Sequence, residues 1–336
     1  MPLPIEEQVV VVTGASSGIG RATALEFSRR GAAVVLAARS EDALRELDRE
    51  IHEAGGRSYV SVTDVGEWDQ VERLADQAVE HFGRIDAWVN NAGVAVYASV
   101  EETMPEETER VIRVNLLGEI WGSRAALVKM KAQGSGTIIN VSSILGARSV
   151  PLQAAYSASK HGVRGFSEAL RVELEADKIP VDVVVIMPSS MNTPFFDHAR
   201  SKLGVKPQPI PPVYDPQVTA EAIVEAAIHP RRQIVTGGAG RLFTAMQSLT
   251  PGMLDRYMAS GRRMIKQQRS EEPDDGRDNL FQPSGVTAGK SDGSYGEHAM
   301  HSSTYTRVFE QHPMRKKAAA VAGAAGAVFL IRRVAR

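Results

Sequence analysis

A tyrosine and a lysine four residues apart, Tyr156 and Lys160, are the residues of this chain best suited to proton transfer. At that spacing two side chains share one face of a helix. A phenol has an ordinary pKa of about 10, and a neighbouring ammonium favours its ionised form. The pair is therefore a candidate acid–base device, although the spacing alone also describes an ordinary surface helix.

A glycine-rich stretch, residues 13–20, provides a second candidate site. It reads Thr13-Gly14-Ala15-Ser16-Ser17-Gly18-Ile19-Gly20, after a β-branched run at residues 8–13 and before a helix-forming segment. Glycines let backbone N–H groups approach a pyrophosphate, and the start of a helix favours the anion. An ordinary glycine-rich turn is the alternative, but the strand before and the helix after favour phosphate binding.

Polar residues also follow the carboxyl ends of other predicted strands, where open α/β sheets bind ligands. They are Arg39 after residues 33–38, Asp64-Val65 after 57–62, Asn90-Asn91-Ala92-Gly93 after 85–89, and Ser142-Ser143 after 136–141. The asparagine pair also suits a tight turn, and the serines also suit helix capping. Asn115 lies in the apolar part of a helix predicted over residues 106–133. Its amide needs a partner there, so Asn115 is either a bonded core residue or a functional one.

The residue after the second predicted strand indicates which dinucleotide is preferred. NAD sites carry Asp or Glu near this point to bind the ribose 2′-OH. Here Ala38 is followed by Arg39, and the first carboxylate is Glu41. A guanidinium suits a 2′-phosphate, so we predict NADP over NAD. The alternative is that Arg39 is a solvated residue at a helix start.

Strands that alternate with helices predict an α/β fold, a doubly wound seven-stranded parallel sheet with helices on both faces. The predicted strands are residues 8–13, 33–38, 57–62, 85–89, 136–141, 181–187 and 233–236. The chain has 336 residues, 43% hydrophobic and 24% charged, which is enough for one large domain with a real core.

The composition argues against several classes of protein. A net charge of -1 without a basic stripe in the main body argues against nucleic-acid binding. The absence of cysteine excludes disulfides, thiolate metal ligands and a cysteine nucleophile, and it fits a reducing compartment. The eight histidines are scattered, so we expect no metal site. Residues 1–7 do not read as a signal peptide, so we expect a cytoplasmic protein.

In order along the chain, these motifs resemble the short-chain dehydrogenase/reductase family over about residues 6–240. They are Thr13-Gly14-x-x-x-Gly18-x-Gly20, Asp64, Asn90-Asn91-Ala92-Gly93, Asn115, Ser143 and Tyr156-x-x-x-Lys160. The resemblance implies a Rossmann-fold oxidoreductase that interconverts an alcohol and a ketone or aldehyde by hydride transfer with NADP(H). One departure is Pro188-Ser189, where the family usually has Pro-Gly.

The resemblance also implies a role for each matched residue. Tyr156 would be the general acid or base, Ser143 would hydrogen-bond the reacting oxygen, and Ser142 is the alternative to Ser143. Lys160 would bind the nicotinamide ribose and lower the pKa of Tyr156, and Asn115 would hold a relay water. Tyr156 and Lys160 would also contact the cofactor, together with Gly14, Ser16, Ser17, Gly18, Ile19, Gly20, Arg39, Asp64, Val65, Asn91, Ala92, Gly93, Pro188 and Thr193. Within this set the glycines would bind the pyrophosphate, Asp64 and Val65 the adenine, Asn91 the adenosine ribose side and Thr193 the carboxamide.

The chain continues for about ninety residues beyond the matched region. We predict a catalytic domain over residues 1–240 and an apolar helical stripe over 241–266. The stripe would pack on the domain, cap the substrate mouth or meet a partner. Residues 267–315 read as a mostly disordered linker. Residues 316–336 read as an Ala-rich helix with basic flanks, whose apolar run 318–331 is short for a membrane span. Membrane association through this tail and a free or protein-bound helix are both open.

Two other functions remain as alternatives to the enzyme. One is a dinucleotide-binding redox sensor without turnover, and the other is a membrane-tethered scaffold. Phe195-Phe196 and the methionine-rich segment suggest a hydrophobic small-molecule substrate, although the same residues also suit a core. Family analogy suggests a homo-oligomer.

Overall fold

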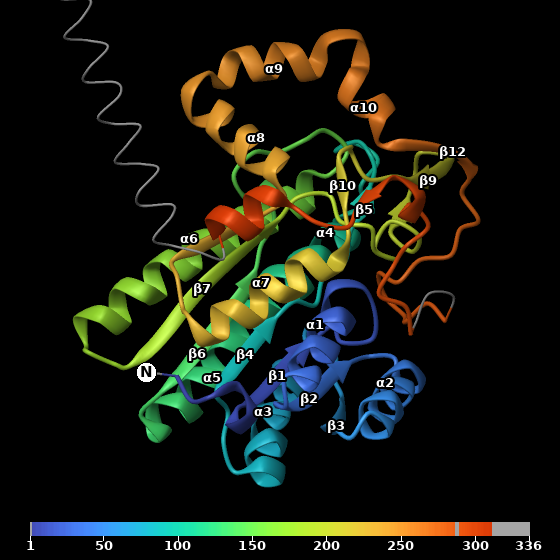
Figure 1. Ribbon diagram of the computed structural model, residues 1–336. Helices are drawn as coiled ribbons and strands as arrows, with labels where there is room; N and C mark the ends of the chain where they lie inside the picture. The colour runs from blue at the N-terminus through green and yellow to red at the C-terminus, as the bar shows by residue number, and fades with distance from the viewer. Residues whose placement is uncertain (1, 286–288, 311–336) are drawn as a thin grey trace, which may run out of the picture.

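Short runs of β-branched and small residues form a central parallel sheet of seven strands (Figure 1). The computed structural model describes residues 2–285 and 289–310. The strand order is β11-β7-β6-β4-β1-β2-β3, and every neighbouring pair is parallel. The strands are β1 (Val9–Thr13), β2 (Ala33–Ala38), β3 (Arg57–Val62), β4 (Ala87–Asn90), β6 (Gly136–Val141), β7 (Val181–Pro188) and β11 (Gln233–Thr236). The predicted doubly wound α/β fold is confirmed.

Helices cover both faces of this sheet and create two hydrophobic cores. Val9 and Val11 of β1 belong to one core, and Val10 and Val12 belong to the other, because successive side chains of a strand point to opposite faces. The first core is closed by α3 (Trp68–Phe82), α4 (Pro105–Ile112), α5 (Gly118–Gln133) and α6 (Ala154–Ala176). The second is closed by α1 (Gly18–Arg29), α2 (Glu41–Glu53) and α7 (Pro216–Ile228).

The direction of winding reverses between β1 and β4, which are neighbours in the sheet. From β1 the chain proceeds outward through β2 and β3, and then returns to place β4 on the other side of β1. A crevice opens outside the carboxyl ends of the strands at such a reversal, and it is the usual ligand site of the fold. The glycine-rich turn after β1 and the asparagine pair at the end of β4 therefore meet there.

The chain after β11 forms a helical extension beyond the end of the sheet (Figure 1). Its helices are α8 (Gly238–Leu249), α9 (Pro251–Ala259) and α10 (Arg263–Gln267). Leu254, Met258 and Met264 are buried in one cluster with Val150 of the catalytic region. The apolar stripe predicted over residues 241–266 therefore packs on the main body with one of its faces.

Small two-stranded sheets lie outside the central sheet, and the last two of them join the extension to loops of the main body. They pair β5 (Val96–Tyr97) with β8 (Arg200–Ser201), β9 (Val205–Pro207) with β12 (Arg269–Pro273), and β10 (Val213–Tyr214) with β13 (Ala299–Met300). Short 3-10 helices cover Ile5–Glu7, Ile144–Gly146, Ser260–Arg262 and Gly296–His298, and π-helical turns cover Arg113–Leu117 and Thr306–Glu310.

The region expected to be a mostly disordered linker, residues 267–315, differs from that expectation where the structure describes it. Gln268, Leu280 and Thr306 are fully buried. Anchors of this kind are sparse in the sequence, so the composition alone resembles that of a linker. The helix predicted over residues 316–336 lies outside the described residues. Among the described helices, none is long and apolar enough to cross a membrane.

Candidate active site

The glycine-rich turn opens into a cavity of about 460 Å³. Gly14 and Gly18 have φ values of +69° and +56°, which favour glycine. A Cβ on Gly20 would lie 2.1 Å from the carbonyl oxygen of Gly14, so no larger residue fits. Helix α1 begins at Gly18, which lines the cavity with Ile19. A tight turn at a helix N-terminus fits a pyrophosphate.

Most residues predicted to bind a dinucleotide line this one cavity. They are Gly14, Ser16, Ser17, Gly18, Ile19, Arg39, Asp64, Val65, Asn91, Ala92, Gly93, Tyr156, Lys160, Pro188 and Thr193. Ser143 of the predicted catalytic set also lines it, whereas Gly20 and Asn115 lie behind its wall. The sequence therefore located the cavity, and the side-chain contacts below show what each residue does in it.

The Asn91 side chain supports the glycine-rich turn. The Asn91 side chain donates a hydrogen bond to the carbonyl oxygen of Thr13 at 3.0 Å. The Thr13 hydroxyl in turn accepts from the backbone N–H groups of Asn91 and Ala92, at 3.0 and 3.2 Å. The amide of Asn91, which we predicted to reach the adenosine ribose, is thus used to hold the glycine-rich turn against β4.

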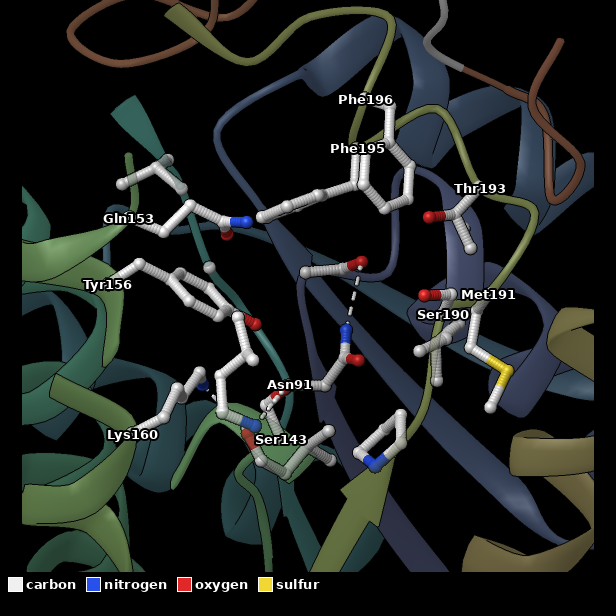
Figure 2. Close-up of a pocket in the computed structure, with 18 of the residues that line it drawn as sticks. Asn91, Ser143, Gln153, Tyr156, Lys160, Ser190, Met191, Thr193, Phe195 and Phe196 are labelled. Carbon is white, nitrogen blue, oxygen red and sulfur yellow. Dashed lines mark hydrogen bonds between the residues drawn. The ribbon is translucent and has the colours of Figure 1, made fainter. Parts of the chain in front are cut away.

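Tyr156 and Lys160 project from α6 into the other end of the cavity (Figure 2). The Lys160 Nζ lies 6.0 Å from the centre of the Tyr156 ring. Ser143 lines the cavity beside Tyr156, close enough for its hydroxyl to lower the pKa of the phenol. Ser142 Oγ instead donates to the backbone carbonyl of Lys160 at 2.8 Å, so it faces α6. This arrangement places Ser143, and not Ser142, beside the phenol.

A buried glutamate on α5, which the sequence reasoning missed, contacts the lysine. Lys160 Nζ lies 2.7 Å from Glu119 Oε1 and 2.7 Å from the carbonyl oxygen of Val141. The two charged side chains are 3% and 2% exposed. Glu119 Oε2 is buried and has no hydrogen-bond partner among the described residues. A carboxylate four residues after Asn115, in an otherwise apolar stretch, is the signal that could have identified it.

Burial dominates the proton affinities of this cluster. It raises the pKa of Glu119 to about 7, against the lowering effect of Lys160. Burial also raises the pKa of Tyr156, and Lys160 and Ser143 offset part of that rise while the Glu119 charge adds to it. The net pKa of Tyr156 is therefore raised, although the expected lowering effect of Lys160 is present. Lys160 acts in that direction, but the low polarity of the site outweighs it.

Asn115 lies in the π-helical turn Arg113–Leu117, a type of helical irregularity that is frequent at functional sites. Its Oδ1 accepts from the backbone N–H of Val94 at 2.8 Å, and its Nδ2 donates to the Val94 carbonyl at 2.9 Å. A further bond from Nδ2 reaches Ser159 on α6 at 3.3 Å. The side chain is thus a fully bonded core group, and its role in holding a relay water remains a prediction.

The residues expected at the adenosine end are engaged by protein partners. The Asp64 carboxylate pairs with Arg110 at 2.6 Å and accepts from the backbone N–H of Gly66 at 2.8 Å. The Arg39 guanidinium donates to three backbone carbonyls of the C-terminal extension, those of Asn279, Leu280 and Phe281. The extension therefore forms part of the wall at this end of the cavity.

Two side chains of this wall are candidates to bind a ligand. Asn279 and Ser284 both line the cavity, and Asn279 Oδ1 and Ser284 Oγ are buried without a partner among the described residues. Farther along, the backbone N–H of Gly18 donates to the carbonyl oxygen of Lys290 at 2.9 Å. These contacts come from residues more than two hundred positions away from the glycine-rich turn, so local sequence patterns gave no sign of them.

The cavity beside Tyr156 is mainly apolar. Phe195 and Phe196 face Tyr156 and Ser143 across it, near Thr193 (Figure 2). Its remaining apolar lining includes Tyr97, Leu145, Val150, Ile210, Phe243 and Met264. Gln153 Nε2 donates to Gln268 Oε1 at 2.7 Å, which ties the start of α6 to the extension. The site thus places a phenol and an ammonium at the wall of an apolar chamber.

A family model described as short chain dehydrogenase matches residues 8–204. The chain belongs to the short-chain dehydrogenase/reductase family. It is 38% identical to the uncharacterized oxidoreductase YxnA of Bacillus subtilis, over 82% of this chain and 77% of that protein. It is 31% identical to dehydrogenase/reductase SDR family member 7B of Bos taurus, over 80% of this chain and 84% of that protein.

Solved structures of this family share the fold and contain dinucleotides. A short-chain dehydrogenase/reductase from Burkholderia phymatum, in complex with NAD, has a TM-score of 0.69 and 27% identity, over 75% of this chain and 96% of its own. An alcohol dehydrogenase from Thermococcus sibiricus, complexed with 5-hydroxy-NADP, has a TM-score of 0.60 and 30% identity, over 68% of this chain and 95% of its own.

The family's usual Pro-Gly after the sixth sheet strand is Pro188-Ser189 here. Ser189 Oγ donates to the carbonyl oxygen of Gly237 at 3.1 Å. A Cβ on Gly240 would lie 2.3 Å from the same Oγ, so α8 approaches this serine closely. The substitution therefore connects the end of β7 to the start of the helical extension.

Among the described residues, no group of acidic and histidine side chains is arranged to hold a metal ion.

Proposed function

We propose that this protein is an NADP(H)-dependent oxidoreductase that interconverts an alcohol and a ketone or aldehyde. The observation that carries the proposal is that Tyr156 and Ser143 line the same cavity as the glycine-rich turn, with Ser143 close enough to lower the pKa of the phenol. A protein that only binds a dinucleotide has no use for a phenol and a hydroxyl that converge on an apolar chamber. Membership in an oxidoreductase family supports the same conclusion.

The residues that line the cavity fit a dinucleotide, and they define what the protein contributes to the proposed reaction. When bound, a nicotinamide dinucleotide supplies or accepts the hydride. In the reducing direction Tyr156 would donate its proton to the carbonyl oxygen of the substrate, and Ser143 would hydrogen-bond the same oxygen as negative charge develops. The Lys160 ammonium would stabilise the phenolate that remains. Asn279 and Ser284 would bind polar groups at the adenosine end.

The substrate that best fits this chamber is an apolar carbonyl compound or alcohol. Phe195, Phe196 and Tyr97 form a cluster of aromatic rings around the place where the reacting oxygen would lie. An apolar group gains about 25 cal/mol for each Å² that it buries against such a surface. A larger apolar substituent should therefore increase kcat/KM until the chamber is filled.

A panel of carbonyl compounds tests the proposed reaction. We expect the purified protein to oxidise NADPH in the presence of aldehydes and ketones, with kcat/KM rising from small polar members to long-chain or polycyclic ones. NADPH consumption is followed by its absorbance, with product identified by mass. Tight NADPH binding without turnover on any member of the panel would count against the proposed function.

Replacing Arg39 with aspartate tests the preference for NADP. We expect Arg39→Asp to weaken NADPH binding by about 10- to 100-fold more than NADH binding, because a hydrogen bond to a charged group contributes roughly 1.5–3 kcal/mol. Since Arg39 also anchors residues 279–281, part of the loss will be common to both dinucleotides. Dissociation constants are measured by fluorescence. Arg45→Asp, at an exposed position of α2, is the charge-matched control. Equal losses for both dinucleotides would contradict the preference.

A further inference from the structure

The helices after β11 turn large apolar side chains toward solvent. Leu242 is 65% exposed, Leu249 is 81% exposed and Met253 is 70% exposed, with Met246 and Tyr257 also exposed. Leu242, Met246 and Leu249 are spaced by four and three residues on α8, and Met253 and Tyr257 by four on α9. The inner side is already satisfied, because Leu254, Met258 and Met264 are buried against the main body. We call the five exposed residues the outer stripe.

The charged residues of the helices that carry the outer stripe are almost all positive. Residues 238–268 contain exposed cations at Arg241, Arg256, Arg262, Arg263 and Lys266. The sole acidic residue in that range is Asp255, and it pairs with Arg148. Glu271, Glu272, Asp274 and Asp275 follow directly, and Lys206 pairs with Glu272 and Asp275, so the excess of positive charge belongs to residues 238–268 themselves. Apolar side chains bordered by Arg and Lys are typical of helices that lie on an anionic membrane surface.

The described chain ends beside the start of α8. The backbone N–H of Gly237, just before α8, donates to Thr306 Oγ1 at 3.0 Å, and the π-helical turn Thr306–Glu310 packs on β11. Residues 311–336 follow from this point, outside the described residues. Their sequence contains Arg315-Lys316-Lys317, the apolar run 318–331 and Arg332-Arg333. A second segment of similar sequence character thus follows, in the chain, the turn that contacts the start of α8.

We propose that the outer face of α8–α10 is a docking surface for an anionic lipid bilayer. The outer stripe would enter the interfacial layer of the membrane, and the five cations would contact lipid phosphates and carboxylates. A second copy of this chain is disfavoured as the occupant, because two such faces would bring like charges together. Phe243, Tyr257 and Met264 of the same segment line the cavity, so docking would place its entrance near lipid.

Flotation with lipid vesicles tests the docking surface with the full chain. We expect the protein to bind vesicles of phosphatidylcholine with phosphatidylserine at least about ten-fold more tightly than vesicles of phosphatidylcholine alone, and added salt to weaken that binding. The double variant Leu249→Glu/Met253→Glu should lose about ten-fold in affinity for the anionic vesicles. The matched control is Val128→Glu/Val172→Glu, on α5 and α6, where both valines are exposed. Its affinity should be unchanged.

Two results would overturn the proposal. If Leu249→Glu/Met253→Glu binds anionic vesicles as well as the wild type does, any affinity for lipid lies elsewhere in the chain. If the wild type ignores vesicles and sedimentation velocity shows an oligomer that the same variant dissociates, the outer stripe is an interface between copies. Vesicle binding is measured without substrate or dinucleotide, so its failure leaves the proposed reaction untouched. A failure of the carbonyl panel likewise leaves the docking surface untouched.

Discussion

Replacing Tyr156 with phenylalanine is expected to lower kcat by about 10²- to 10⁴-fold, the usual contribution of a positioned general acid. The ring would still fill its place between Phe195 and the lysine, because only the hydroxyl is removed. Dinucleotide affinity should therefore stay within about two-fold of wild type, since the glycine-rich turn is untouched. Single-turnover reduction of the best carbonyl substrate and fluorescence titration with NADPH measure the two quantities.

The control for this variant is Tyr97→Phe. Tyr97 is another buried tyrosine that lines the same cavity, and it loses the same hydroxyl. Its kcat should fall much less, because it belongs to the apolar wall rather than to the Ser143 pair. If Tyr156→Phe retained full turnover, Tyr156 would not be the acid. The wild type and Tyr156→Phe could both fail to turn over any substrate while the cellular effect of the protein survives Tyr156→Phe. A dinucleotide-binding sensor would then explain the fold better.

The fold could be predicted because its determinants are local. Four consecutive valines in β1 make both faces of the strand apolar, which is typical of a strand buried on both faces of a parallel sheet. Glycine at positions 14, 18 and 20 is required by positive φ or by close backbone approach, so the turn is visible in the sequence itself. Parallel strands then bring the residues after each strand to one edge, and the cavity follows.

The contacts within the cavity could not be predicted in the same way, because they depend on which distant groups meet. Asn91 was expected to face a ligand, but its amide is used by the Thr13 carbonyl of a neighbouring strand. Arg39 was expected to bind a phosphate, but its guanidinium donates hydrogen bonds to the backbone carbonyls of residues 279–281 in the extension. Composition suggested a disordered linker for that segment, because a single buried leucine, Leu280, hardly alters an average.

Replacing Glu119 with alanine is the second large effect that we expect. The variant should lose about 3–5 kcal/mol of unfolding free energy at neutral pH, since it leaves the buried Lys160 ammonium without its carboxylate. Denaturant titration measures the loss. Glu119→Gln keeps an oxygen that can accept from Lys160 Nζ and fills the same volume, so it should lose much less. Equal losses for the two variants would mean that the charge, rather than the hydrogen bond and the packing, is the main contribution of Glu119.

The pH dependence of stability separates Glu119 from an ordinary ion-paired glutamate. Because its folded pKa is about 7, above the ordinary 4.5, the stability linked to its protonation is complete below about pH 4.5 and is lost as pH rises through 7. The loss of stability in Glu119→Gln relative to wild type should therefore become smaller as pH rises across that window.

Glu26 provides the opposite case, and it is the matched control. Burial acts to raise its pKa, but hydrogen bonds and charges from Arg29 and Arg30 lower it overall. Its stabilising effect is thus present above its ordinary pKa and is lost as pH falls through the lowered value. Glu26→Gln should accordingly lose stability relative to wild type as pH rises from acid to neutral. Parallel slopes for the two variants would show that Lys160 keeps Glu119 ionised at neutral pH and would contradict the raised pKa of Glu119.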